Sequence, residues 1–312
     1  MYRSAPARSR QSYRHEAFFW RNQADFTDGM VAFIREGLAV GEPVMVALVQ
    51  EHTDWLRDAL GSDASYVKFV DMGEIGRNPA RIIPAWQEFL EAPETRGGPA
   101  RGIGEPIWTG RRDVEITECQ LHEALLNVAL DPKTPFWLLC PYDSTGLDAP
   151  VLDEASRSHH AILDADSYRG STTYGGRAHV DSLFSAELPA RPEGLAEVTF
   201  TEDNVHDVFA LVMREAYLAD LWSDKALDLA TAARDLAGDS LRRGADGGLV
   251  RVWNEPSALI CEVTDTTTVD DVLAGRRHHG QDHGLWSANQ LCDLVQLRSA
   301  PSGTTIRLHS WK

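Results

Sequence analysis

Residues 135–140 read Pro-Phe-Trp-Leu-Leu-Cys, an apolar run with the length of one fully buried strand. Comparable apolar runs occur upstream, and segments with the apolar spacing of a helix separate them. Strands that are apolar throughout and alternate with helices indicate a parallel sheet covered on both faces, so the sequence predicts an α/β fold here. The predicted strands are 15–20, 43–49, 66–70, 101–104 and 135–140, and the predicted helices are 25–40, 52–60, 79–90, 113–130 and 149–158.

The carboxyl ends of these strands are the expected ligand-binding edge of the sheet. Glu105, Trp108 and Tyr142 come just after predicted strands, so we expect them to contact a bound small molecule. No GxxxxGK[ST] sequence follows any predicted strand. A Walker-type phosphate loop is therefore not expected.

A segment from about residue 168 to residue 194 is rich in turn formers and lacks apolar periodicity. The domain boundary is therefore predicted there, with a first domain over 1–185, a linker over 186–198 and a second domain over 199–312. In the second domain, helices are predicted at 205–218, 225–243 and 285–292, and strand pairs at 248–253 with 258–264 and at 294–299 with 304–310. Helices combined with hairpins indicate an α+β sandwich, with the helices on one face of an antiparallel or mixed sheet.

The charge balance is strongly acidic, because 47 Asp and Glu outnumber 30 Lys and Arg and give a net charge of −17. Such a surface repels phosphate backbones, so direct nucleic-acid binding is not expected. The stretch 201–240 alone carries nine acidic and three basic residues, a net −6. Acidic helices attract a basic, DNA-binding protein while they repel the DNA itself.

No apolar run is long enough to span a membrane, and the Arg- and Ser-rich first residues do not have the pattern of a secretory signal. We expect a cytoplasmic protein without membrane attachment. The four cysteines form no Cys-x-x-Cys pair, so free thiols are expected in a reducing compartment.

Several motifs of the second domain match one known family. They are DLAGDSLRRG at 235–244, EVTD at 262–265, LAGRR at 273–277, GLWSANQLCDLV at 284–295 and GTTIR at 303–307. Together they resemble the histidine-kinase-like (GHKL) ATPase domain of anti-sigma factors of the RsbW kind. The resemblance implies a sigma factor or a STAS-type anti-sigma factor antagonist as partner, and a possible homodimer.

The resemblance also implies nucleotide-binding roles for particular residues. Asp235 stands where the family has its catalytic Glu, Asp239 where it has the Asn that holds Mg²⁺, and Asp265 where it has the Asp that binds adenine. Gly284 belongs to the last glycine box, and Thr304 belongs to the final motif that completes the nucleotide site. The sequence departs from the family's boxes, because Asp239 replaces Asn, Thr267 replaces the Gly of Asp-x-Gly and Arg243 replaces His. The last glycine box also keeps only His283-Gly284-Leu285. We therefore expect binding of ATP and Mg²⁺ to be weak or lost.

Motifs of the first domain match a second family. They are GEPIW at 104–108, ECQLHEALLN at 118–127, WLLCPYD at 137–143, and HEAFF at 15–19 followed by Gly37-Leu and Gly41-Glu-Pro. They resemble the MEDS (DcmR-type) sensory domain, which implies a RecA-like sheet without its P-loop. In actinobacteria this domain is fused ahead of anti-sigma ATPase domains, in regulators of the RsbA kind, and the order here is the same.

A possible metal or redox site also lies in the first domain. Cys119 and His122 are three residues apart on one predicted helix, Glu123 joins them one turn after Cys119, and Cys140 and His15 lie on predicted strands. Thiolate and imidazole ligands suit Zn²⁺, although buried structural side chains explain the same pattern. The neighbouring histidines at 159–160 and 278–279 are interpreted as ordinary side chains, because adjacent residues point in different directions.

Three functions follow from these observations. The first is a signalling regulator that couples a signal sensed by the first domain to binding of a sigma factor or its antagonist. The second is a serine protein kinase that uses Mg-ATP to phosphorylate the antagonist. The third is a metal or redox sensor that uses the Cys and His residues of the first domain.

Overall fold

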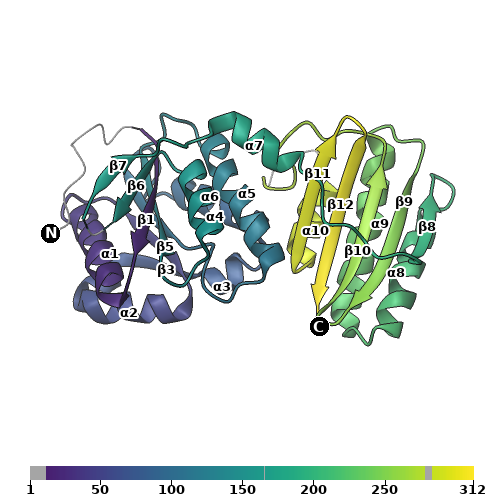
Figure 1. Ribbon diagram of the computed structural model, residues 1–312, viewed down its shortest axis with the longest axis horizontal. Coiled ribbons are helices and arrows are strands. Elements are labelled where there is room, and N and C mark those ends of the chain that lie inside the picture. The colour runs from purple at the N-terminus through teal and green to yellow at the C-terminus, as the bar shows by residue number, and fades with distance from the viewer. Residues whose placement is uncertain (1–11, 165, 278–282) are drawn as a thin grey trace. The chain divides into compact units, whose positions relative to one another are not determined.

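The computed structural model describes residues 12–164, 166–277 and 283–312. It divides into two compact units, Met1–Val180 and Asp181–Lys312, each built on its own β-sheet. Figure 1 labels the elements of both units. Within the described residues, no helix has both the length and the apolar character needed to cross a membrane.

The first unit contains a seven-stranded sheet, sheet A, with strand order β3-β2-β4-β5-β1-β6-β7. All neighbouring strands are parallel except β6 and β7, which are antiparallel at one edge. The α/β architecture predicted for this unit is confirmed, with one antiparallel edge strand added. The strands are β1 Arg14–Trp20, β2 Val44–Leu48, β3 Val67–Asp71, β4 Ala100–Gly104, β5 Phe136–Asp143, β6 Ala161–Asp164 and β7 Tyr168–Gly170.

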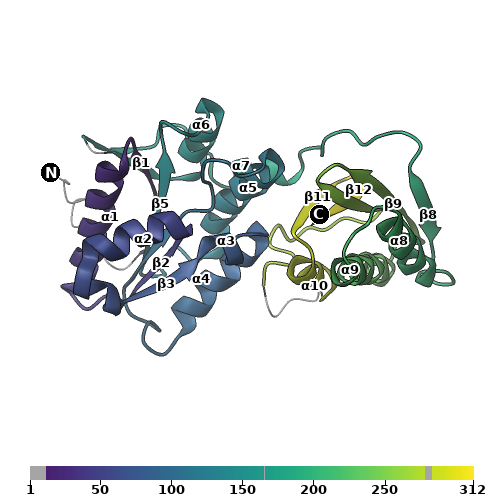
Figure 2. The same cartoon turned by 90° about the horizontal axis from the view of Figure 1, so that it is seen from below.

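Helices cover both faces of sheet A, as expected for buried parallel strands (Figure 2). Phe18 of β1 packs on helix α1, where a Cβ built on Gly29 would lie 2.5 Å from the Phe18 ring, so only glycine fits. His15 and Ala17 of β1 point to the opposite face, toward α5. The helices are α1 Gln23–Leu38, α2 Gln50–Leu60, α3 Met72–Ile75, α4 Ile82–Glu91, α5 Asp113–Ala129, α6 Ala149–Ser158 and α7 Gly176–Phe184, with 3-10 turns η1 Gly61–Tyr66 and η2 Pro79–Arg81.

The second unit contains a five-stranded antiparallel sheet, sheet B, with strand order β11-β12-β10-β9-β8. Helices α8, α9 and α10 lie together on one face of this sheet (Figure 2), which agrees with the predicted α+β arrangement. Its assignment to the histidine-kinase-like ATPase fold stays a prediction. The elements are β8 Ala196–Phe200, α8 His206–Leu218, α9 Ser223–Arg242, β9 Gly248–Glu255, β10 Ala258–Asp265, α10 His283–Leu291, β11 Leu294–Ala300 and β12 Gly303–Trp311.

The segment predicted to be irregular, 168–194, contains regular structure. Strand β7 and helix α7 lie within it, and the division between the compact units falls inside α7, between Val180 and Asp181. The predicted linker, 186–198, lies in the second unit, and its last residues begin β8. These elements escape a periodicity search because β7 has three residues and α7 begins directly after Gly175.

Candidate functional site

Four buried side chains with metal-binding chemistry converge between sheet A and the helices α5 and α6. They are His15 on β1, Glu123 on α5, Cys140 on β5 and His159, the C-cap residue of α6. One ligand atom from each lies within 4.8 Å of the others, and none of the four residues is more than 1 % exposed. We call these four residues the His₂GluCys cluster.

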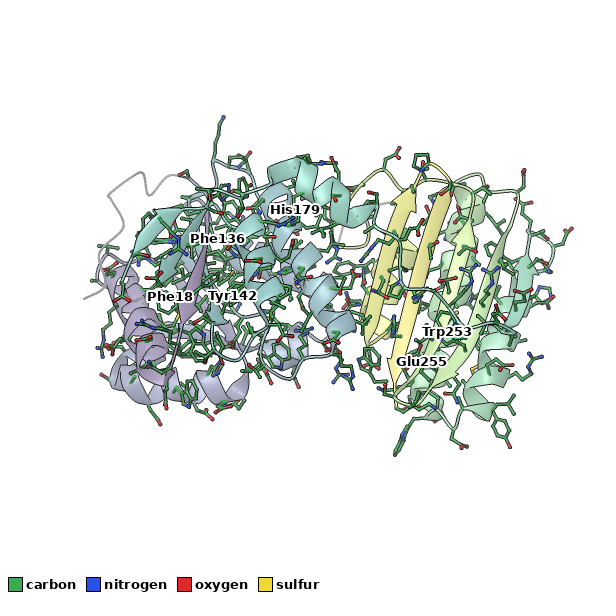
Figure 3. All side chains as sticks on the ribbon, viewed as in Figure 1. Phe18, Phe136, Tyr142, His179, Trp253 and Glu255 are labelled. Atoms are coloured by element: carbon green, nitrogen blue, oxygen red, sulfur yellow. The ribbon has the colours of Figure 1, made fainter. Side chains whose placement is uncertain are left out.

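The close contacts within the cluster centre on the Glu123 carboxylate. Its Oε2 lies 2.9 Å from Nε2 of His15 and 3.2 Å from Nε2 of His159. The Cys140 thiol donates to Nε2 of His15 over 3.5 Å. The phenol ring of Tyr142, labelled in Figure 3, meets the His159 ring edge-on with centroids 5.7 Å apart. The cluster therefore joins two strands and two helices through polar atoms in an apolar interior.

The outer nitrogens of both histidines are held by acceptors. Nδ1 of His159 lies 2.7 Å from the carbonyl oxygen of Ala155. Nδ1 of His15 lies 3.2 Å from Oδ1 of Asn127, whose amide nitrogen donates to the carbonyl oxygen of Ser158 over 2.7 Å. Such partners fix the orientation of each imidazole ring.

Electrostatics in this interior favour a neutral His15 imidazole and a neutral Cys140 thiol. Burial and, to a smaller extent, the neighbouring His159 lower the pKa of His15 to about 4, although the Glu123 carboxylate acts in the opposite direction. Burial and the Glu123 charge raise the pKa of the Cys140 thiol well above its ordinary value. A proton added to His15, or removed from Cys140, therefore costs free energy unless a cation joins the cluster.

The predicted metal ligands are brought together only in part. His15, Glu123 and Cys140 meet, but Cys119 and His122 lie outside the cluster, and His159 is its fourth member. The Cys119 thiol donates to the carbonyl oxygen of Pro106 over 3.2 Å, and burial raises its pKa to about 12.

Of the two neighbouring histidine pairs, only the pair at 159–160 lies within the described residues, and its first member is buried. His159 is fully buried in the cluster, because α6 ends there and its C-cap residue turns inward. The pair 278–279 lies outside the described residues.

The residues predicted to contact a sensed ligand have different surroundings from one another. Glu105 is buried, and its carboxylate oxygens lie 2.7 and 2.8 Å from Nδ1 of His52 at the carboxyl edge of sheet A. Burial alone lowers the pKa of His52, but the hydrogen bond and the charge of Glu105 raise it above its ordinary value. Trp108 lies under the Arg111 guanidinium, whose carbon is 4.2 Å from the ring centroid. Tyr142 is buried beside the His₂GluCys cluster.

A pocket that the sequence did not indicate lies at the start of β1. Its volume is about 340 Å³, and it is lined by Tyr13, His15, Glu16, His160 and Tyr168, among others. His15 thus belongs both to the wall of this pocket and to the His₂GluCys cluster.

In the second unit, the residue predicted to bind adenine is fully engaged by its own chain. One Asp265 oxygen accepts hydrogen bonds from the Ser240 hydroxyl, over 2.5 Å, and from Arg243, over 3.0 Å. The other accepts bonds from the Thr267 amide, over 2.7 Å, and from the Thr267 hydroxyl. The Thr304 hydroxyl in turn donates to the Thr267 carbonyl oxygen over 2.7 Å.

The residue predicted to hold Mg²⁺ is engaged as well. Oδ1 of Asp239 contacts Arg242, and Oδ2 accepts a hydrogen bond from the Gly284 amide over 2.7 Å. A Cβ built on Gly284 would lie 2.2 Å from that oxygen, so this approach requires glycine. Asp235, at the predicted catalytic position, pairs with its neighbour Arg234 over 2.8 Å.

An exposed apolar surface, which sequence reasoning did not single out, surrounds the junction of α8 and α9. Four large apolar side chains are exposed there by 51–82 %. We call them the α8–α9 patch: Tyr217, Leu218, Trp222 and Leu227. Folding leaves such side chains in water only at a cost, so an apolar patch of this kind is typical of a binding surface.

The comparisons with known proteins address the first unit. No curated protein matches the chain. Residues 14–160 match the model of the MEDS family, described as the MEthanogen/methylotroph, DcmR Sensory domain. The matched segment contains all four residues of the His₂GluCys cluster. The first unit is therefore similar to the MEDS sensory domain, and this match supports a role for the protein in signalling.

Proposed function

We propose that the protein is a signalling regulator of the anti-sigma-factor type, in which the MEDS-like first unit senses a signal and the second unit binds a sigma factor. The single observation that carries the binding role is the α8–α9 patch. Aromatic and aliphatic anchors that are exposed together are the usual hot spots of protein interfaces.

The charge around the patch supports a basic partner. Asp220, Asp224 and Asp228 are interspersed with its four apolar residues along the chain. Exposed apolar side chains with acidic neighbours complement a basic, DNA-binding protein such as a sigma factor, and the acidic neighbours accelerate association by electrostatic steering.

The contacts of the predicted nucleotide site support protein binding over phosphoryl transfer. Adenine recognition by Asp265 needs a free carboxylate oxygen, yet both oxygens already accept two hydrogen bonds each. A Mg²⁺ ion held by Asp239 would have to displace Arg242 and the Gly284 amide. Both changes break existing buried hydrogen bonds, which lowers the net affinity for nucleotide.

The proposal is tested by titrating the full chain with purified, fluorescently labelled alternative sigma factors of the source organism. We expect binding that weakens with rising salt, and a loss of at least about tenfold in affinity for Trp222→Ala. Tyr66→Ala is the matched control, since Tyr66 is 73 % exposed in the first unit and lies outside the patch.

Several outcomes contradict the proposal. One is that no sigma factor binds in the titration. Another is that Trp222→Ala and Tyr66→Ala bind as tightly as the unmodified chain. Capture of a STAS-type antagonist or self-association through the patch in place of sigma binding also counts against it.

A further inference from the structure

The geometry of the His₂GluCys cluster is close to that of a tetrahedral metal site. With bonds of about 2.0–2.3 Å from zinc to N, O and S ligands, the ligand atoms of a tetrahedral site lie about 3.3–3.8 Å apart. The observed separations from Nε2 of His15 are 2.9 Å to Glu123 Oε2 and 3.5 Å to Cys140 Sγ, and Glu123 Oε2 lies 3.2 Å from Nε2 of His159. The remaining pairs of ligand atoms lie within 4.8 Å of one another. Shifts of no more than about one ångström therefore convert the cluster into a coordination shell.

The hydrogen bonds outside the cluster determine which histidine nitrogens face its centre. Nδ1 of His159 lies against a carbonyl oxygen, which only accepts, so Nδ1 carries the proton. The Asn127 amide nitrogen donates to the Ser158 carbonyl, which leaves Oδ1 of Asn127 as the acceptor for Nδ1 of His15. In the neutral form, both rings therefore direct an unprotonated Nε2 at the Glu123 carboxylate.

The cluster is consequently rich in acceptors and poor in donors. In the part of the chain that the structure describes, neither the Glu123 oxygens nor Nε2 of His159 have a hydrogen bond of good geometry. Although burial raises the pKa of Glu123, the two imidazoles lie close enough to lower it. The Cys140 thiol supplies one proton, and it is directed to His15. A carboxylate that is 1 % exposed and faces lone pairs is costly to bury without a cation.

We propose that the His₂GluCys cluster binds one Zn²⁺ ion through Nε2 of His15, Nε2 of His159, Oε2 of Glu123 and Sγ of Cys140. Zinc favours this mixture of imidazole, thiolate and carboxylate ligands in four-coordinate sites. On binding, the Cys140 S–H bond breaks, its sulfur forms the bond to zinc, and the proton leaves to solvent. The charges of Zn²⁺, the thiolate and the carboxylate then sum to zero in the apolar interior.

The surroundings supply two further features of a metal site. Asn127 and the Ala155 carbonyl are the outer hydrogen-bond partners that orient ligating histidines in proteins. The pocket of about 340 Å³ at the start of β1, which His15 helps to line, lies next to one of the four ligands. A bound ion links β1, β5, α5 and the end of α6, so metal occupancy controls the packing of the sensory unit.

The first experiment measures metal content and coordination. The full chain is expressed with added zinc, purified without a metal-binding tag and assayed by elemental analysis, where we expect about one zinc per chain. Replacement of zinc by Co²⁺ should give thiolate-to-cobalt charge-transfer absorption together with intense visible bands of tetrahedral cobalt. Both should disappear in Cys140→Ser and persist in Cys119→Ser, the matched control on α5 with a buried thiol outside the cluster.

A second measurement keeps the test valid if Cys140→Ser does not fold. With Zn²⁺ in about hundredfold excess over its dissociation constant, the first unit of the unmodified chain should melt about 5–10 °C higher than in chelator. His159→Gln should lose most of this shift. The proposal is overturned if the zinc-treated chain holds no stoichiometric metal, if the charge-transfer band survives Cys140→Ser, or if Cys119→Ser abolishes it equally.

Discussion

Glu123 in the first unit and Asp265 in the second are buried carboxylates with opposite surroundings. Each side chain is 1 % exposed. The oxygens of Asp265 accept four hydrogen bonds from residues of its own unit, whereas those of Glu123 face two imidazole nitrogens without a hydrogen bond of good geometry. A carboxylate with a full set of donors is a structural group, and one that is surrounded by acceptors is a site for a cation.

If the two carboxylates differ in this way, the largest effect on unfolding free energy is expected from Asp265→Ala. This change leaves the partly buried Arg243 guanidinium and the buried Ser240 hydroxyl without their shared acceptor, so we expect a loss of about 3–5 kcal/mol in the unfolding free energy of the second unit. Urea denaturation followed by circular dichroism measures it. Asp235→Ala is the control and should cost less than about 0.5 kcal/mol, because Asp235 is 34 % exposed and pairs with its neighbour. Equal losses would show that Asp265 is not the structural anchor.

Acid should lower the stability of the second unit, because this unit contains a buried histidine that stays neutral when the chain is folded. His309 is 4 % exposed, and burial together with the charge of Arg307 lowers its pKa to about 3. Because the unfolded chain takes up the proton first, near pH 6.5, stability falls as the pH drops below that value and continues to fall toward the folded pKa. We expect roughly 3 kcal/mol of loss between pH 6.5 and 4, measured by urea denaturation at a series of pH values.

The contribution of His309 is isolated by substitution. His309→Gln should flatten the pH dependence, while His206→Gln, at a side chain that is 76 % exposed, should leave it unchanged. A slope that persists in His309→Gln would assign the acid sensitivity to other groups.

A smaller effect is expected from Glu123→Gln in metal-free protein. No hydrogen bond to Glu123 is lost, and the new amide group provides a donor for Nε2 of His159, so the unfolding free energy in chelator should change by less than about 1 kcal/mol. The same variant should lose the stabilisation by zinc. A loss above about 3 kcal/mol in chelator would mean that Glu123 forms a buried ion pair with a protonated histidine, and the contrast with Asp265 would fail.

The smallest change in stability is expected from the addition of nucleotide. Since both oxygens of Asp265 are engaged, millimolar Mg-ATP should raise the melting temperature of the second unit by less than about 1 °C. Differential scanning calorimetry with and without Mg-ATP measures this shift. A rise of several degrees would require that Thr267 and Arg243 release Asp265, and would revive the kinase alternative.

The fold was predictable wherever apolar runs are long. The run at 135–140 and the helical pattern at 113–130 correspond to β5 and α5 with small shifts at their ends. The antiparallel edge strand β7 was not predictable, since only three residues, with no apolar alternation, form it. Strand β8, Ala-Glu-Val-Thr-Phe, follows directly on Gly194-Leu and was not predictable either. It is stabilised by pairing with β9, and this long-range contact cannot be recognised from the local sequence.

Three of the four residues of the candidate metal site were predictable. The sequence grouped His15, Glu123 and Cys140, and the pairing of β1 with β5 brings the two strand residues together. Helix α5 is buried on nearly every side, so periodicity does not tell which of His122 and Glu123 faces β1. His159 was missed because the presence of His160 beside it argues against a shared site. The direction of the His159 ring depends instead on its position as the C-cap residue of α6.

The position of β1 in sheet A determines when the first unit can complete its fold during synthesis. Ala17 on β1 pairs with Cys140 on β5 and with Ile162 on β6. The partner strands of β1 are therefore synthesised more than a hundred residues after it. In sheet B, by contrast, β9 and β10 pair across a tight turn, as do β11 and β12. Folding slows as contacts become less local, so the nascent first unit holds the apolar β1 unpaired on the ribosome until β5 and β6 emerge. Chaperone demand during translation therefore falls on the first unit, and the His₂GluCys cluster is among its last features to assemble.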